Sequence, residues 1–215
     1  MTLRALVFLG YESTLADANV YLASAQELRG DVQWNVWPYP RDADASMQAA
    51  LDGFGNDRFD QVVSMIRGEP DTLHYVVGHS SGCAIANAVV AGLGDPPAFS
   101  ARVRLVALDG FRPSELIMAD HPDTECWHAW CNGSNVPGIG PFSRGSVRSL
   151  NWDYGNEGKP WFKTYRATNC FGEWALHFSL VNKAASDATV IDIAHGYNDC
   201  IANLDVLTLP VPVVA

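Results

Sequence analysis

The stretch "HYVVGHSSGCAIANAVVAGL", residues 74–93, combines three patterns in a fixed order. An apolar run ends at Gly78, a serine follows between two glycines, and small residues at helical spacing come next. A short apolar run bounded by glycine is typical of a buried strand, and a sharp turn from strand into helix requires residues without bulky side chains. The stretch therefore predicts a strand, a tight turn at Ser80 and a helix.

Strand patterns of the same kind recur along the chain. They occur at residues 3–10, 73–78 and 102–110, and in the segments "VQWNVWPYP", "PWFKTYRAT" and "ATVIDIA". Helical spacing separates them, so the alternation predicts an α/β fold with a mostly parallel, doubly wound sheet. A length of 215 residues suits a single domain covering 1–215. In such sheets ligands lie at the carboxyl ends of the strands.

Helices are predicted over residues 14–28, 43–53, 58–67, 81–93 and 172–184. In the first of these, Leu15, Val20, Leu22 and Leu28 give a rough apolar face that we expect to pack on the sheet. A short helix is also expected after Asp199.

Residues 111–160 lack this periodicity. They are rich in Gly, Pro, Asn, Ser and Trp, as in "HAWCNGSNVPGIGPFSRG". A long irregular stretch within a compact domain is commonly functional. We therefore expect an insertion that acts as a lid, whose tryptophans either bind an apolar ligand or anchor the loop itself.

The charge balance excludes some classes of partner. The formal net charge is −10, with only 14 Lys and Arg residues, so neither nucleic acid nor an anionic membrane surface is expected as a partner. No apolar stretch is long enough to span a bilayer, and the start of the chain lacks the pattern of a signal peptide. We expect a cytoplasmic protein.

The five cysteines form no C-x-x-C pair. Cys126 and Cys131, with His121 and His128 nearby, could form a zinc site. Reduced thiols without metal are the favoured interpretation.

Gly78-His79-Ser80-Ser81-Gly82 fits the G-x-S-x-G pattern, with a predicted strand before it and a helix after it. In that context the turn raises the Ser80 hydroxyl above the sheet and directs the backbone N–H of Ser81 to the same place. This makes Ser80 the candidate nucleophile and Ser81 the first oxyanion donor. The second donor is expected from the loop after the first strand, at the backbone N–H of Tyr11. The alternative is a Gly/Ser turn that serves packing alone.

A serine nucleophile requires a base. Of the six histidines, His195 directly follows a predicted strand, "ATVIDIA", and opens a loop, "HGYND". It is also the last histidine, which matches the order of serine, acid and histidine in α/β-hydrolases. His195 is the candidate base, with His177 in reserve.

The acid is expected to orient the imidazole. Asp109 ends the strand "RVRLVALDG", which follows the helix after Ser80, so it should lie one strand away from the serine. Asp192 falls inside a predicted strand, Asp187 at its opposite end, and Asp199 resembles a helix-start acid. Asp109 is therefore the candidate, although helix capping is the competing role.

The segments "GHSSGCAIANAVV", "VRLVALDGFRPSE" and "IDIAHGYND" together resemble α/β-hydrolases, in particular the thioesterases of polyketide and nonribosomal peptide biosynthesis. The resemblance spans roughly residues 74–113 and 189–200. It implies Ser80, Asp109 and His195 as the catalytic triad.

These features together predict a serine hydrolase that forms an acyl-enzyme on Ser80 and needs no cofactor or resident metal. The expected substrate is an acyl thioester, on a carrier protein or coenzyme A, released by hydrolysis or cyclisation. A carboxylesterase or lipase acting on oxygen esters uses the same groups. A non-covalent cyclase or ligand-binding protein on the same fold is the alternative of a different class. The oligomeric state is left open.

Overall fold

The computed structural model describes residues 2–11, 13–28, 30–43, 47–94, 102–108, 125–130, 135–136, 140–141 and 162–166. The statements that follow concern these residues. They include the strand, turn and helix of residues 74–93.

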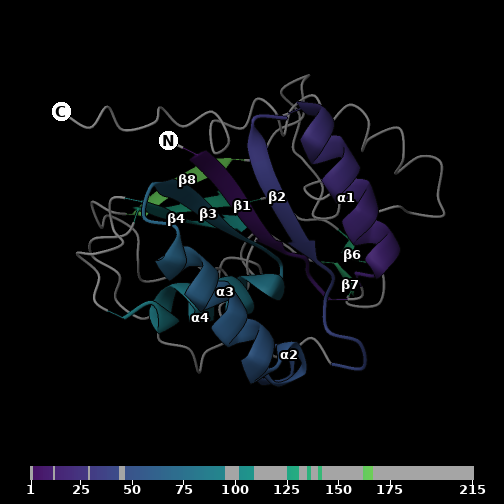
Figure 1. Cartoon of the computed structure of the whole chain (residues 1–215). Helices are drawn as coiled ribbons and strands as arrows, with labels where there is room; N and C mark the ends of the chain where they lie inside the picture. Colours follow the sequence, from purple (N-terminus) through teal and green to yellow (C-terminus); the bar gives the residue numbers. More distant parts are fainter. Residues whose placement is uncertain are drawn as a thin grey trace.

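The described strands form a six-stranded sheet in the order β2-β1-β3-β4-β5-β8, and every neighbouring pair is parallel (Figure 1). Their bounds are β1 Thr2–Phe8, β2 Val32–Trp37, β3 Thr72–His79, β4 Val103–Leu108, β5 Glu125–Trp130 and β8 Phe162–Arg166. The predicted parallel α/β architecture is confirmed.

Helices lie on both faces of this sheet. The helix α1 (Leu15–Leu28) covers one face, while α2 (Met47–Phe54), α3 (Asn56–Gly68) and α4 (Gly82–Gly92) cover the other (Figure 1). The chain passes from β1 through α1 to β2, and then back across the other face to β3. The direction of winding therefore reverses between β1 and β3, where an open α/β sheet has its topological switch point.

The apolar composition of β1 and β3 explains why these two strands lie at the centre of the sheet. Both faces of β1 and β3 are covered by helices, so a parallel strand there must be apolar on both sides. The β1 residues Ala5–Phe8 are at most 1% exposed, and all eight residues of β3 are buried. Unbroken apolar runs such as "ALVF" supply that surface.

The predicted apolar face of α1 is wrong at Leu15 and Val20, while Leu22 is half-buried and the side chain of Leu28 lies outside the described part of the chain. Leu15 is 67% exposed and Val20 is 36% exposed, whereas Ala18 and Tyr21 face the core at 2% and 4%. Tyr21 packs edge-on against Trp34 of β2, with ring centroids 6.3 Å apart. Small alanines allow the helix to approach the sheet closely, so that one tyrosine fills the space expected for several leucines.

The helix begins with a capping box. Asp17 accepts hydrogen bonds from the backbone N–H and the hydroxyl of Thr14, both at 2.7 Å, and the Asp17 N–H donates back to the Thr14 oxygen at 3.3 Å. These bonds satisfy N–H groups that the first turn leaves without helical partners. They fix where the loop after β1 ends.

Part of the stretch 111–160 belongs to the sheet. Residues Glu125–Trp130 form β5, which pairs with β4 on one side and β8 on the other. The expectation of irregular structure is wrong for these six residues. Two short antiparallel strands, β6 (Asn135–Val136) and β7 (Gly140–Pro141), also fall within the stretch. The remainder lies outside the described residues, so the lid stays a prediction.

In the part of the chain described above, no helix combines the length and the hydropathy needed to cross a membrane.

Candidate functional site

Ser80 lies in a strained turn between β3 and α4. Its φ is 52°, in the left-handed region, and Asp42 is the other non-glycine residue with positive φ in the described part of the chain. A side chain in this conformation costs roughly 1–3 kcal/mol, so the surrounding structure must hold it there. Ser80 itself is 4% exposed.

Close backbone packing holds the turn. A Cβ on Gly82 would meet the carbonyl oxygens of Phe8 and Leu9 at the end of β1, the latter at 2.6 Å. A Cβ on Gly78 would meet the backbone of Cys83 in the first turn of α4. Both glycines of the G-x-S-x-G pattern are therefore needed because other backbone segments occupy the space of a side chain.

Gly10, after β1, is close to the same turn. A Cβ there would lie 2.6 Å from the Cβ of Ser80 and 2.9 Å from the backbone oxygen of His79. A side chain at position 10 would therefore collide with the serine turn, so this close contact requires a glycine there.

Helix α4 begins directly at the serine pair. The N–H of Cys83 donates to the Ser80 carbonyl and the N–H of Ala84 to the Ser81 carbonyl, both at 3.1 Å. Ser81 has helical angles, φ −63° and ψ −20°. Ser81 is the N-cap of α4, so Ser80 lies directly before the cap, next to the partial positive charge of the helix N-terminus.

The two residues predicted to form the oxyanion hole are in contact. The backbone N–H of Tyr11 donates to the side-chain oxygen of Ser81 at 3.0 Å, across 70 residues of sequence. This bond joins the loop after β1 to the turn after β3. It also means that in this state the Tyr11 N–H is directed at the Ser81 hydroxyl.

Two histidines have described surroundings. His79 precedes Ser80 and is 2% exposed. His74 is fully buried near the start of β3. Ser80 lies six positions further along the chain, which at the rise of a strand is about 20 Å, so His74 cannot serve as the base. Asp109, His195 and the reserve base His177 lie outside the described residues, and the triad stays a prediction.

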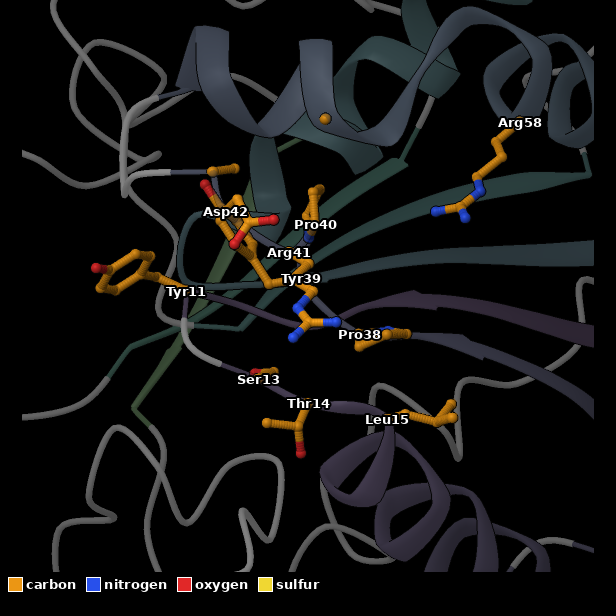
Figure 2. A pocket seen from close by; sticks show the side chains of 12 residues that line it. Tyr11, Ser13, Thr14, Leu15, Pro38, Tyr39, Pro40, Arg41, Asp42 and Arg58 are labelled. Atoms are coloured by element: carbon orange, nitrogen blue, oxygen red, sulfur yellow. The ribbon is translucent and has the colours of Figure 1, made fainter.

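A cavity of about 1010 Å³ lies at the carboxyl ends of β1 and β2 (Figure 2). Neither Ser80 nor Ser81 is among the residues that line it. Its lining comes from the loop after β1, the start of α1, the loop after β2, and single residues of α2 and α3. Tyr11 belongs to this lining and also bonds to Ser81. The cavity and the serine therefore share one loop.

Most of the cavity lining was not singled out in the sequence. Tyr39 and Arg41 follow β2, and Arg58 lies on α3. The available signal was "PYPRD", a proline-interrupted loop at the carboxyl end of a predicted strand, where ligands bind in parallel sheets. Nothing local in α3 marks Arg58.

Within the described residues, no group of three or more His, Cys, Asp or Glu side chains could hold a metal ion. The side chains considered for zinc, at Cys126, Cys131, His121 and His128, lie outside this description. Cys83 is a buried thiol.

The parallel sheet, the helices on both faces and the strand–turn–helix at Ser80 are those of an α/β-hydrolase fold. No protein-family model matches the chain, and no curated protein matches it in sequence.

Similar proteins are found among the solved structures, and the three that follow each have a TM-score below 0.5. A Xanthomonas campestris protein described as a hydrolase of the α/β superfamily shows 15% identity and a TM-score of 0.48, with 95% of this chain and 100% of that chain covered. An acetyl xylan esterase shows 12% identity and a TM-score of 0.43, with 98% of both chains covered. A cutinase-like protein from Cryptococcus sp. shows 13% identity and a TM-score of 0.39, with 92% and 95% covered. These likenesses do not extend to an activity or a substrate.

Proposed function

We propose that the chain is a serine hydrolase that transfers the acyl group of an ester or thioester to Ser80 and then to water. The supporting observation is the left-handed turn at Ser80, held by Gly10, Gly78 and Gly82 at the switch point of the sheet. A turn that only joined a strand to a helix would not need a strained serine. Strain of this kind is typical of functional positions.

The proposed reaction has two stages. The Ser80 oxygen attacks the acyl carbon while His195 takes the serine proton, and the bond to the leaving group breaks as His195 returns that proton to it. Water then attacks the Ser80 ester by the same route and releases a carboxylic acid. Asp109 holds the imidazole in the productive tautomer.

The backbone N–H groups of Ser81 and Tyr11 are the proposed oxyanion donors. The Tyr11 N–H now donates to the Ser81 hydroxyl, so it must turn from that oxygen, or be shared with it, when the oxyanion forms. Loss of one such donor typically lowers the rate about a hundred- to a thousandfold.

Labelling with a fluorophosphonate tests the nucleophile directly. We expect a mass shift on the peptide that contains Ser80, which Ser80→Ala abolishes. Ser81→Ala is the matched control because it removes the neighbouring hydroxyl and keeps both backbone donors, so it should still be labelled. Absence of the label on folded wild-type protein would favour the non-covalent alternative.

A thioester is the proposed substrate class, in preference to an oxygen ester. This choice depends on the sequence resemblance of residues 74–113 and 189–200 to thioesterases. Acyl thioesters and oxygen esters of matched chain length separate the two, and a higher kcat/KM for the oxygen esters would refute the choice. Expected acyl carriers are a carrier protein or coenzyme A.

A further inference from the structure

The cavity at the carboxyl ends of β1 and β2 is lined by two arginines that differ from the other described arginines in their contacts. Arg41 and Arg58 are exposed and line it. The other described arginine side chains all have partners: Arg4 binds Glu69, while Arg67, Arg102 and Arg104 donate to backbone carbonyls. Within the described part of the chain, the side chains of Arg41 and Arg58 have neither an ion pair nor a hydrogen bond to another protein group. Their donors are available to a ligand.

The position of Arg41 is set by a tight turn. The N–H of Ala43 donates to the Pro40 carbonyl at 3.4 Å, and Asp42 takes a φ of 68°. A Cβ on Gly53 of α2 would lie 2.6 Å from the Cβ of Pro40, so the helix is packed closely against the turn. Backbone strain combined with close packing fixes the backbone of the turn that carries Arg41.

The two guanidinium groups come from different elements. Arg41 follows β2 and Arg58 belongs to α3, and Figure 2 shows the two side chains at separate positions around the cavity. Asp42 adds one carboxylate, so two positive and one negative side chain give the lining a net charge of +1. The whole chain carries −10, so this cavity differs in sign from the protein around it.

The remaining lining includes apolar surface. Tyr39 is 4% exposed and meets Tyr11 edge-on, with ring centroids 5.8 Å apart. Leu15, 67% exposed, contributes an apolar side chain that no core contact explains. Aromatic and aliphatic surface beside arginines suits a ligand that has an apolar part joined to an anion.

We propose that this cavity binds a phosphate or carboxylate group of the acyl donor through Arg41 and Arg58, so that the substrate of Ser80 is an anionic ester or thioester. The inference rests on the proposed function, because Tyr11 connects the cavity to the serine turn. A phosphate would lie on the leaving group, as in coenzyme A, and a carboxylate on the acyl group. Arginine binds both anions in the same forked geometry.

Binding of a small anion tests the cavity without any turnover. Calorimetry on the Ser80→Ala protein should detect phenyl phosphate and benzoate, but not the neutral benzyl alcohol. Arg41→Gln and Arg58→Gln should each weaken binding of the anions about tenfold. Gln61→Glu is the control, since it makes the same change in net charge on an exposed position of α3 outside the cavity. Unchanged anion affinity in both arginine variants would overturn the proposal.

Kinetics then identify the source of the anion. Acetyl-coenzyme A is compared with the neutral S-acetyl-N-acetylcysteamine, and 4-nitrophenyl hemisuccinate with 4-nitrophenyl acetate. The arginine variants should raise KM for one charged donor about tenfold, with kcat and the neutral donors unaffected. Equal kcat/KM for charged and neutral donors would refute anion recognition. If anions bind but Ser80 is neither labelled nor active, the proposed hydrolase fails and the anion site remains.

Arg41→Lys and Arg58→Lys separate loss of binding from loss of folding. Each keeps the charge and removes the planar fork. Weaker anion binding with unchanged thermal unfolding supports recognition by the fork. A glutamine variant that binds weakly only because its unfolding temperature has fallen counts against the proposal.

Discussion

At its amino end, strand β3 begins in a network of charged side chains, whereas at its carboxyl end it runs into a strained turn. Glu69 accepts hydrogen bonds from Arg4 at 3.0 Å and from His74 at 3.1 Å. Arg4 also donates to Asn35 and Gln33 of β2. The amino end is thus held by paired polar groups, while the turn at Ser80 is held by close backbone contacts.

This difference suggests that the amino end of β3 serves stability and the carboxyl end serves function. At the amino end Arg4, Glu69 and the Nε2 of His74 are paired with one another, and the unpaired Nδ1 of His74 is buried, so this network presents no free polar group to a ligand at the surface. At the carboxyl end, the turn at Ser80 retains backbone strain. The N–H of Tyr11 is bonded to the Ser81 hydroxyl and is also the proposed oxyanion donor. The arginines of the cavity have donors available to a ligand. In parallel sheets the carboxyl ends of the strands carry the ligands. Changes at one end should therefore alter turnover, and changes at the other end should alter stability.

The largest expected effect is on turnover at the carboxyl end. Ser80→Ala should lower kcat/KM at least about a thousandfold, because the nucleophile is lost while binding remains. Its free energy of unfolding should stay close to that of the wild type, since alanine keeps the Cβ that packs near Gly10.

Glu69→Gln is the counterpart at the amino end. It should lower the free energy of unfolding by about 1–2 kcal/mol, through weaker bonds to Arg4 and His74, without a change in kcat/KM below the melting range. Denaturant titration and steady-state kinetics on Ser80→Ala and Glu69→Gln measure the free energy of unfolding and kcat/KM of each variant. Comparable loss of activity in Glu69→Gln would contradict the division between the ends.

The turn itself depends on packing, which Gly82→Ala should disrupt. The added Cβ would meet the Phe8 and Leu9 carbonyls, which are sheet backbone and cannot move aside. We expect a loss of about 3 kcal/mol in the free energy of unfolding. Gly68→Ala is the matched control, because nothing lies within 4 Å of its added Cβ. Replacement of a helical glycine there should stabilise by about 0.5 kcal/mol.

These contacts show how far the sequence could be read. Continuous apolar runs identified β1 and β3, and the G-x-S-x-G pattern between strand and helix located the turn. The strand β5, "ECWHAW", has no such run and was missed because its place depends on pairing with β4 and β8. The bond from Tyr11 to Ser81 and the approach of Arg58 to the cavity depend on tertiary packing, which local patterns do not encode.

Lowering the pH should reduce the free energy of unfolding through His74, at the amino end of β3. Burial lowers the pKa of His74 below its ordinary value, with the bond to Glu69 opposing this in part. The folded state therefore resists a proton that the unfolded chain accepts, and stability present above about pH 6.5 is lost as the pH falls below it. For one proton the slope is at most about 1.4 kcal/mol per pH unit.

His74→Gln isolates this contribution. Unfolding free energies measured between pH 7.5 and 5 should fall less steeply in the variant than in the wild type, even though its stability at neutral pH is lower. If the unfolding free energies of the variant and the wild type fall equally with pH, His74 is not the cause of the acid destabilisation.

The smallest expected effect measures the strain at Ser80. Ser80→Gly removes the Cβ from a left-handed residue, which relieves about 1–2 kcal/mol, but glycine also gains about 0.4–1 kcal/mol of freedom in the unfolded chain. The net stabilisation should be about 0.5 kcal/mol relative to Ser80→Ala, which keeps the Cβ at φ 52°. Both variants lack the hydroxyl, so the difference between them reports the strain minus the freedom that glycine gains in the unfolded chain. If the glycine variant is less stable than the alanine variant by about 1 kcal/mol, the full size of that freedom, the turn stores no strain, and the contrast between the two ends of β3 reduces to their polar contacts.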